Sequence, residues 1–398
     1  MMKSSWKGKR LKRICIIRQW YYPIDPRVRK EAQVSVDVGY NVDLICLRKP
    51  GEKKRESMSG INVYRLPMKH RRGSIVRYLF EYLFFFLLSG LVLLRLYFRH
   101  KYKIIQVNTM PDFLVFATFI PKLLGAKVLL DMHEPVPELW ATKFGNRFQF
   151  FIELLKLVEQ LSIRYADKVL TVTEHLKNVY VSRGADASKI TVVLNVPDNK
   201  IFNFYLCKAN CKGTKHRFIL ISHGTIEKRW GLDLAIKAVA LLRNKIPNIQ
   251  LNILGEGEYL SELRKLVSEL NLGECVHFLG YLPFDGMLKM LAESDIGLVP
   301  MEKNAYSDLI HTNKMFEYIA MGKPVIISRT KAVEAYLNDS CLMFFRPGDE
   351  RGLAHAILEL CDNPAKRESL IYNAQKRYEK ISWDVMKKIY LEVIGSLS

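Results

Sequence analysis

The stretch HTNKMFEYIAMGKPVI, residues 311–326, predicts a short helix that passes directly into a buried strand. Apolar residues recur at helical spacing, and Gly322 followed by Pro324 predicts the end of the helix. The apolar residues 325–327 then predict a strand that is buried on both faces. A helix followed at once by such a strand is typical of α/β folds with a parallel sheet. Within this helix, Glu317 is a carboxylate among mostly apolar residues and needs an explanation.

The same alternation of helices and strands extends over most of the chain and falls into two series. Strands are predicted at residues 13–19, 41–47, 61–66, 104–108, 127–131, 168–172 and 190–194, and again at 218–222, 250–254, 276–279, 296–299, 325–327 and 342–345. Between the two series, residues 196–216 lack periodicity and predict a link between domains. We therefore expect an α/β protein with two doubly wound, Rossmann-like domains over residues 1–196 and 213–381. A chain of 398 residues is long enough for two such cores.

Positive charge is concentrated in the first quarter of the chain. The formal net charge is +21, and residues 1–100 hold 22 Lys and Arg against 7 Asp and Glu, which is +15 of that total. Such a region favours an anionic partner, either nucleic acid or the cytoplasmic face of a membrane. A solvated basic face without a partner would have the same composition. Because no helix-turn-helix, zinc-finger or RNP-like aromatic motif is present, we expect no nucleic-acid partner.

An apolar segment at residues 78–98 suggests how the chain meets a membrane. Its charge-free part, residues 82–94, would be roughly 20 Å long as a helix, against a hydrocarbon core of about 30 Å. The flanking Arg77, Arg95 and Arg99 fit a helix that lies in the membrane interface with its basic ends in the headgroups. A buried helix of an α/β layer and a true membrane span remain alternatives.

The seven cysteines form no array typical of disulfides, which favours a reduced, cytoplasmic setting. Cys207, Cys211 and His216 could form part of a metal site, but a surface loop is the better interpretation. No DxD motif and no cluster of His and Asp indicates a divalent metal. We therefore expect neither a metal site nor another cofactor.

Four predicted strand ends in the second series carry residues that suit a nucleotide. Turns containing glycine and cations can hold a diphosphate, and the backbone of an LGYLP turn could bond a base edge. The Gly-x-Gly pair among these residues is weak support alone. These positions are Gly224, Thr225, Lys228, Arg229, Gly255, Gly257, Gly280, Tyr281 and Leu282. In the opening stretch, amides at Thr312, Asn313 and Lys314 begin the helix, and Glu317 could accept two ribose hydroxyls. An exposed or ion-paired glutamate is the alternative for Glu317.

These residues also resemble a known family. Between residues 221 and 327, the motifs HGT, RWGLDLAIKA, ILGEG, FLGYLP, SDIGLVP and KMFEYIAMGKPVI resemble the C-terminal domain of family-4 retaining glycosyltransferases of the GT-B fold. In the N-terminal half, WYYPIDPRVRKEA, DMHEPVPELW and VTEHLKNVY resemble a bacterial-type subgroup that builds surface polysaccharides and lipid-linked glycans. The resemblance implies two Rossmann-like domains that face each other across a cleft. It also implies that residues 382–398 form a helix that returns to the N-terminal, acceptor-binding domain.

The resemblance also implies roles for single residues. Glu317 matches the second glutamate of the family's EX7E motif, which holds the donor ribose, whereas Leu309 stands at the place of the first glutamate. The family's diphosphate-binding Arg and Lys fall at Thr225 and Trp230, so Arg229 and Lys228 are expected to serve instead. His133 matches a histidine that faces the transferred sugar, with a buried structural histidine as the alternative. Candidates for an acceptor or phosphate contact are Arg27 and Asp25.

The function implied is transfer of a hexose from a UDP- or GDP-linked donor to a glycan or lipid-linked acceptor, with retention and without a metal. Without a clear nucleophilic carboxylate, the family implies front-face substitution. Together with the charge and the apolar segment, this predicts a cytoplasmic enzyme held peripherally at the inner face of the cell membrane. A sugar-nucleotide epimerase of the same two-domain fold is the main alternative, and a basic nucleic-acid-binding protein is a remote one.

Overall fold

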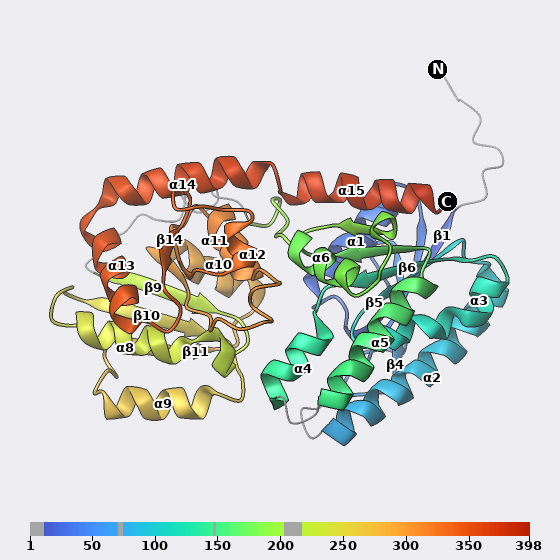
Figure 1. The fold of residues 1–398 in the computed structure, drawn as a ribbon, viewed down its shortest axis with the longest axis horizontal. Helices are drawn as coiled ribbons and strands as arrows, with labels where there is room; N and C mark the ends of the chain where they lie inside the picture. Colours follow the sequence, from blue (N-terminus) through green and yellow to red (C-terminus); the bar gives the residue numbers. More distant parts are fainter. Residues whose placement is uncertain (1–11, 71–74, 146–148, 203–216) are drawn as a thin grey trace, which may run out of the picture. The chain divides into compact units, whose positions relative to one another are not determined.

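The computed structural model describes residues 12–70, 75–145, 149–202 and 217–398, which form two compact α/β units (Figure 1). The first unit contains the described residues up to Leu194 together with Met386–Ser398, and the second is Asn195–Val385. Each unit has one sheet with helices packed against it. The residues of the suggested metal site, Cys207, Cys211 and His216, lie outside the described part of the chain.

The sheet of the first unit has the strand order β3-β4-β2-β1-β5-β6-β7-β8 in the described residues. Its strands are β1 (Arg13–Tyr21), β2 (Asn41–Leu47), β3 (Arg55–Met58), β4 (Ile61–Leu66), β5 (Ile104–Asn108), β6 (Lys127–Met132), β7 (Lys168–Thr171) and β8 (Ile190–Val192). All neighbours are parallel except β3, which pairs antiparallel with β4. The seven predicted strands are confirmed, and β3 was missed. Its RESM sequence has no apolar run, because this edge strand is exposed at alternate residues.

Helices cover both faces of this sheet. They are α1 (Pro26–Asp37), α2 (Ile75–His100), η1 (Asp112–Thr118), α3 (Phe119–Leu123), α4 (Val136–Phe144), α5 (Gln149–Tyr165), α6 (Glu174–Ser182), η3 (Ala187–Lys189) and most of α15 (Trp383–Ser396). The helices α2, α3 and α5 all contact η1 and lie on the same side of the unit (Figure 1). The C-terminal helix α15 packs elsewhere, where the Tyr390 hydroxyl donates to Gln106 Oε1 at 2.7 Å and lies 3.4 Å from Ser35 Oγ.

The sheet of the second unit is fully parallel, with the order β11-β10-β9-β12-β13-β14. Its strands are β9 (Phe218–His223), β10 (Ile249–Leu254), β11 (Val276–Gly280), β12 (Ile296–Val299), β13 (Val325–Ser328) and β14 (Met343–Phe345). All six predicted strands are confirmed. Because β9 lies between β10 and β12, the strand order reverses there, and ligands of doubly wound sheets collect at such a point.

The helices of the second unit cover this sheet and fix the position of α11. They are η4 (Lys228–Trp230), α8 (Leu232–Leu242), α9 (Leu260–Glu269), α10 (Phe284–Glu293), α11 (Asn313–Ala320), α12 (Lys331–Glu334), α13 (Glu350–Asp362) and α14 (Pro364–Glu379). The ring of Tyr378 on α14 lies 5.8 Å from that of Phe316 on α11, and its hydroxyl donates to Pro197 O at 3.1 Å. The helix that carries Glu317 is therefore anchored on its buried side.

Candidate functional site

The predicted donor residues of the second unit gather at one edge of its sheet. Gly224 follows β9, Gly255 follows β10 and Gly280 ends β11, while α11 begins after the loop that leaves β12. The carboxyl ends of parallel strands share one edge, so these turns are neighbours. Gly224 N donates to Leu254 O at 2.9 Å, and Gly255 N donates to Gly280 O at 2.7 Å, which ties the three turns together.

Two of these glycines are required by close backbone packing. A Cβ atom on Gly255 would lie 1.9 Å from Gly224 O, and one on Gly257 would lie 1.9 Å from Ile226 O. No side chain fits into so little space. The Gly-x-Gly pair therefore lets the turn after β10 lie directly against the turn after β9, whether or not it also touches a ligand.

Glu317 has a histidine partner that the sequence analysis missed. His223, the last residue of β9, has Nε2 2.5 Å from Glu317 Oε2 and Nδ1 2.9 Å from the Tyr318 hydroxyl. The Tyr318 hydroxyl also donates to Ile221 O at 3.3 Å. The Glu317 side chain is 17% exposed, so it is neither a surface group nor fully enclosed. The only sequence signal for His223 was its place at a strand end beside Gly224.

The N-terminus of α11 has no side-chain cap. Thr312 stands at the N-cap with extended backbone angles, φ −100° and ψ 140°, and its side chain caps no amide. The first amides of α11 thus have no side-chain cap, and the helix dipole favours an anion there. Asn313 is half-buried at the first helical position. These features leave the predicted donor contact of Thr312, Asn313 and Lys314 as a prediction with suitable geometry.

The place of the missing first glutamate is filled by a half-buried Leu309, and its neighbours have local roles. Asp308 Oδ1 accepts the amide of Lys331 at 3.1 Å at the start of α12. Ser307 Oγ accepts the amide of Asn304 at 2.9 Å within a turn. Both neighbours thus have partners nearby in the fold, and the side chain at position 309 itself offers no carboxylate.

The two cations of the predicted diphosphate loop, Lys228 and Arg229, differ in exposure and in pairing. Thr225 and Lys228 are exposed. Arg229 has Nη2 2.9 Å from Glu227 Oε2, and its guanidinium lies 5.3 Å from the Trp230 ring centre and 4.9 Å from that of Tyr306. The charge of Arg229 is thus partly balanced by a carboxylate and covered by two rings. Of the base-edge candidates, Leu282 is half-buried and Tyr281 is exposed.

Lys314 lies beside this loop, although it belongs to α11. Its side chain is 9% exposed, and Nζ lies 4.5 Å from the ring centre of Trp230. Burial is the main cause that lowers the pKa of Lys314 to about 8; Glu317 and Glu227 oppose this shift, and Arg229 adds to it. From the sequence, Lys314 was predicted only as one of three residues at a helix start, so its nearness to Trp230 is new.

In the first unit, Arg27 and Asp25 are part of the interior. Arg27 is 3% exposed; its Nε and Nη2 donate to Asp131 at 2.7 Å each, and its Nη1 donates to Val193 O at 2.9 Å. Glu31 lies 3.2 Å from Arg27 Nε, and burial together with Asp131 raises the pKa of Glu31. Asp25 caps α1 through the amide of Arg27 at 3.1 Å. Both residues thus have partners within the first unit, and the acceptor or phosphate contact expected of Arg27 and Asp25 stays a prediction.

His133 lies next to this cluster. Its Nδ1 is 3.5 Å from Asp131 Oδ2, and its side chain is 9% exposed. Arg27 and hydrogen bonding hold the pKa of Asp131 below its usual range despite burial. Asp131 therefore stays ionised beneath the His133 ring and can orient it. Contact of His133 with a transferred sugar remains a prediction.

An apolar surface covers α2, α3 and α5 of the first unit. One helix in the described residues, Arg77–His100, is long and apolar enough by length and composition to cross a membrane, and 22% of its most apolar window is buried. We define the apolar surface as the exposed side chains Leu79, Phe80, Leu83, Phe84, Leu87, Leu91, Phe98, Phe119, Ile120, Leu123, Leu124, Phe150, Leu154, Leu157 and Leu161. Only part of α2 faces the core, for example Phe85, which is fully buried, so α2 is not the ordinary buried helix considered above.

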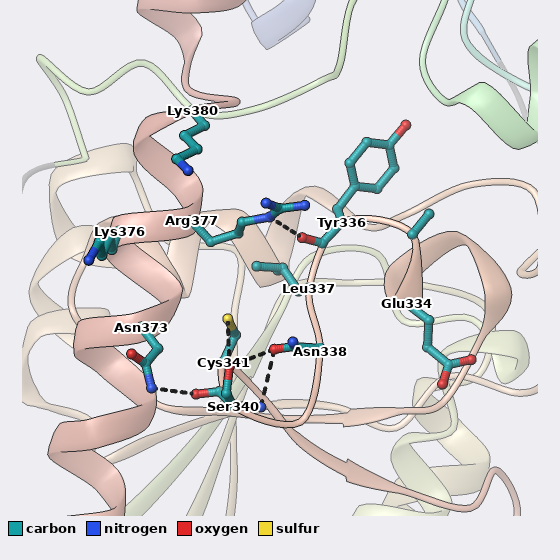
Figure 2. A pocket seen from close by; sticks show the side chains of 11 residues that line it. Glu334, Tyr336, Leu337, Asn338, Ser340, Cys341, Asn373, Lys376, Arg377 and Lys380 are labelled. Atoms are coloured by element: carbon teal, nitrogen blue, oxygen red, sulfur yellow. Dashed lines mark hydrogen bonds between the residues drawn. The ribbon is translucent and has the colours of Figure 1, made fainter.

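A separate cavity of about 380 Å³ lies between α14 and the loop that precedes β14 (Figure 2). Arg377 Nε donates to Tyr336 O at 3.1 Å there, and Asn373 Nδ2 donates to Ser340 O at 3.0 Å. The described lining residues include none of the predicted donor residues. Across the described ranges, no group of three His, Cys, Asp or Glu side chains could hold a metal ion.

Two family models match the chain, one in each half. Residues 25–195 match the glycosyl transferase 4-like domain, and residues 211–377 match the glycosyl transferases group 1 model. Among curated relatives, the amylovoran biosynthesis glycosyltransferase AmsK of Erwinia amylovora is 24% identical over 213 residues, or 53% of this chain and 51% of the relative. A GDP-mannose-dependent monoacylated phosphatidylinositol monomannoside mannosyltransferase of Corynebacterium glutamicum is 26% identical over 45% of this chain and 47% of the relative. The chain therefore aligns with about half the length of each.

Solved structures share the fold over nearly the whole chain. The sucrose-phosphate synthase of Thermosynechococcus elongatus superposes with a TM-score of 0.77 at 19% identity, covering 97% of this chain and 100% of that one. HepE of Anabaena, solved with UDP and glucose, gives a TM-score of 0.72 at 15% identity, covering 96% and 99%. With a family model on each half and this shared architecture, we conclude that the chain belongs to the family-4 glycosyltransferases of the GT-B fold.

Proposed function

We propose that this glycosyltransferase moves a hexose, with retention, from a nucleoside-diphosphate donor to a lipid-linked glycan at the cytoplasmic face of a membrane. The observation that carries this proposal is a combination of two features. In the second unit, glycine-containing turns and the start of α11 gather at one sheet edge, as in nucleotide-binding folds. In the first unit, a large apolar surface is exposed. The first feature suits a soluble, anionic donor, and the second suits an acceptor held in a bilayer. An epimerase would need only the first feature.

The donor part of the proposal rests on the edge around β9 and α11. Glu317 offers a carboxylate oxygen to a ribose hydroxyl, while His223 holds the other oxygen. The uncapped amides of α11 and the turn at Gly224 suit the diphosphate. HepE was solved with UDP, and the Corynebacterium relative is named for GDP-mannose, so UDP and GDP are the two nucleotides to test.

The mechanistic part concerns the leaving group. We propose front-face substitution without a metal, in which protein cations and helix amides stabilise the negative charge that develops on the diphosphate. The acceptor hydroxyl then attacks the anomeric carbon from the side on which the diphosphate leaves. The leaving phosphate oxygen takes up the hydroxyl proton, so that no side-chain base is needed.

The membrane part rests on the composition and exposure of α2, α3 and α5. Fifteen large apolar side chains are too many for an ordinary solvated face. Basic residues are exposed at both ends of α2: Arg77 near its start, and Arg95, Arg99 and Lys101 near its end. The first hundred residues carry +15 of the net charge. An apolar face bordered by cations fits an anionic lipid surface, to which each basic residue can add about 1 kcal/mol. The names of AmsK and of the Corynebacterium relative, which refer to a polysaccharide and a phosphatidylinositol mannoside, agree with a glycan or lipid acceptor.

The donor proposal is tested by thermal unfolding with UDP, GDP and a panel of their sugar derivatives. A nucleotide present at ~100 times its dissociation constant should stabilise the folded protein by ~2.7 kcal/mol and raise its melting temperature. UMP, GMP and free sugars serve as controls. Absence of stabilisation by every nucleoside diphosphate and sugar derivative would overturn the donor assignment.

A further inference from the structure

The diphosphate loop of this chain lacks the cations that its family places there. Thr225 and Trp230 stand at the two basic positions that the resemblance identifies. Of the remaining cations, Arg229 is ion-paired with Glu227, and Lys228 is exposed. The loop therefore offers one partly balanced and one exposed cation, and a cation from another element would add to the stabilisation of a bound diphosphate.

Lys314 is a cation from another element that reaches this loop. A Cβ atom built on Gly224 would lie 2.9 Å from Lys314 Cε and 3.5 Å from its Nζ, so the lysine stem lies against the Gly224 backbone. Gly224 also has a φ of +110°, which disfavours any other residue. The turn after β9 thus depends on glycine both for its backbone angle and for the space that Lys314 occupies.

The Lys314 ammonium is held by an aromatic ring instead of a carboxylate. Its Nζ lies 4.5 Å from the Trp230 ring centre, which is within cation–π range. The described residues place no hydrogen-bonding or ion-pairing partner against the ammonium, although Glu317 and Glu227 act on it from farther away. Trp230 Nε1 is likewise buried and donates to no atom of the described residues. Two donors without acceptors thus lie together beside the phosphate turn.

The spacing of Lys314 and Glu317 on α11 suits the diphosphate and the ribose of a single nucleotide. Lys314 and Glu317 are three residues apart, so they lie on the same helix face with Cβ atoms about 5–6 Å apart. In a nucleoside diphosphate, the diphosphate follows the ribose directly. A helix that offers Glu317 to the ribose therefore offers Lys314 to the phosphates on its N-terminal side, where the helix amides also lie.

We propose that Lys314, held on the face of Trp230, binds the donor diphosphate and stabilises the charge that forms on it, in place of the loop lysine that Trp230 replaces. This inference rests on the proposed function. In that reaction, the bond between the anomeric carbon and the diphosphate oxygen breaks, and its electron pair stays on the diphosphate. The new bond joins the anomeric carbon to the acceptor oxygen, whose proton passes to the leaving phosphate. The ammonium acts on the oxygen that gains the charge.

The test compares binding of UDP and GDP with binding of UMP and GMP by calorimetry, in the parent and in Lys314→Met. The substitution keeps the length of the side chain and removes its charge. We expect the affinity for the preferred diphosphate to fall about tenfold to a hundredfold, as for a lost charge-assisted hydrogen bond. The affinity for the monophosphate should change much less. Lys314→Arg should recover part of the diphosphate affinity, and Lys265→Met, at an exposed lysine of α9, is the matched control.

Each other result counts against the inference. Equal losses for monophosphate and diphosphate would mean that Lys314 only supports the helix, and no loss would return the role to Lys228 or Arg229. If Lys314→Met does not fold, Trp230→Leu and Trp230→Phe replace it. The leucine should lose diphosphate affinity and the phenylalanine, which keeps a ring face, should retain it; equal binding by both would contradict the inference. If the parent protein binds no nucleotide, the proposed function is overturned. If the parent binds diphosphates and Lys314→Met binds them with the same affinity, only this inference is overturned.

Discussion

The Glu317 carboxylate is oriented by two neighbours of different kinds. His223 fixes one oxygen at 2.5 Å, and α11 itself is held by the contact between Phe316 and Tyr378. A carboxylate that is oriented before the ligand arrives loses little conformational entropy on binding. This arrangement explains why a glutamate is placed in an otherwise buried helix, and it makes the residue a sensitive point for mutation.

Replacing Glu317 with Gln should weaken binding of the donor nucleotide at least tenfold. The amide keeps the shape of the side chain but loses charge-assisted bonds to ribose hydroxyls, each worth about 1.5–3 kcal/mol at most. Calorimetry with the preferred nucleoside diphosphate measures the change, with the melting temperature as a check of folding. Glu334→Gln is the matched control, because Glu334 is an exposed glutamate that pairs with Arg329. Unchanged nucleotide affinity in Glu317→Gln would contradict the ribose assignment.

The pKa of Lys314 predicts how nucleotide binding depends on pH. With a pKa of about 8, the side chain is mostly an ammonium at pH 7 and mostly a neutral amine at pH 9. A diphosphate favours the ammonium, so binding above pH 8 requires uptake of a proton. The affinity should therefore fall by up to about tenfold per pH unit above 8.

The same titration in Lys314→Met provides the control for this pH dependence. The variant should lack the decline that the lysine causes, so the ratio of parent to variant affinity should shrink between pH 7 and pH 9. A ratio that stays constant over this range would show that Lys314 does not titrate against the bound diphosphate.

The sequence alone can select a candidate residue where a single position stands out, but it cannot show which distant residue is its partner. Glu317 could be selected because a carboxylate in an apolar helix stands out. His223 could not, since its meeting with Glu317 depends on β9 and α11 coming together across 94 positions of sequence. The pairing of Arg27 with Asp131, across 104 positions, could not be predicted for the same reason.

At the scale of elements, α2 has two apolar faces with different surroundings. Phe85 and Leu93 are fully buried against the unit, whereas Phe80 is 73% exposed and Leu83 and Leu87 are 53% exposed. The sequence predicted a helix here but could not separate the two faces, because both are apolar. Only the packing against η1, α3 and the sheet decides which residues remain outside.

Replacing Phe80, Leu83 and Leu87 with Ser should release the protein from anionic vesicles without unfolding it. Each change removes apolar area from the proposed membrane contact while the buried face, including Phe85, stays intact. Vesicle sedimentation at low and high salt measures binding, and nucleotide affinity should remain unchanged. The matched control is the double variant Leu241→Ser and Tyr372→Ser, which alters exposed apolar residues of the second unit. Equal sedimentation of the parent and the triple variant would contradict the lipid-facing assignment.

The strands were the most predictable elements, for a physical reason. Strands in a parallel sheet with both faces covered consist of apolar runs, and such runs are visible in the sequence. The edge strand β3 lacks such a run because it is exposed at alternate residues, so it became recognisable only through its pairing with β4.

At the level of the whole molecule, the features that the sequence singles out divide between the two units. The charge and the apolar segment belong to the first unit, and the nucleotide-type turns belong to the second. The sequence motifs indicated the GT-B fold because several of them follow one another in the order found in that family. The extent of the apolar surface could not be read in the same way, since α3 and α5 join α2 only in the folded unit.

We propose above that the protein transfers a sugar from a nucleoside diphosphate to a lipid-linked acceptor. The most direct measurement follows a radiolabelled UDP- or GDP-sugar incubated with the parent protein and vesicles that contain lipid-linked saccharides. We expect label to enter the lipid fraction together with an equal release of nucleoside diphosphate, and we expect Glu317→Gln to reduce both strongly. Conversion of the sugar while it stays attached to the nucleotide, without label in lipid, would rule out this transfer and favour the epimerase alternative.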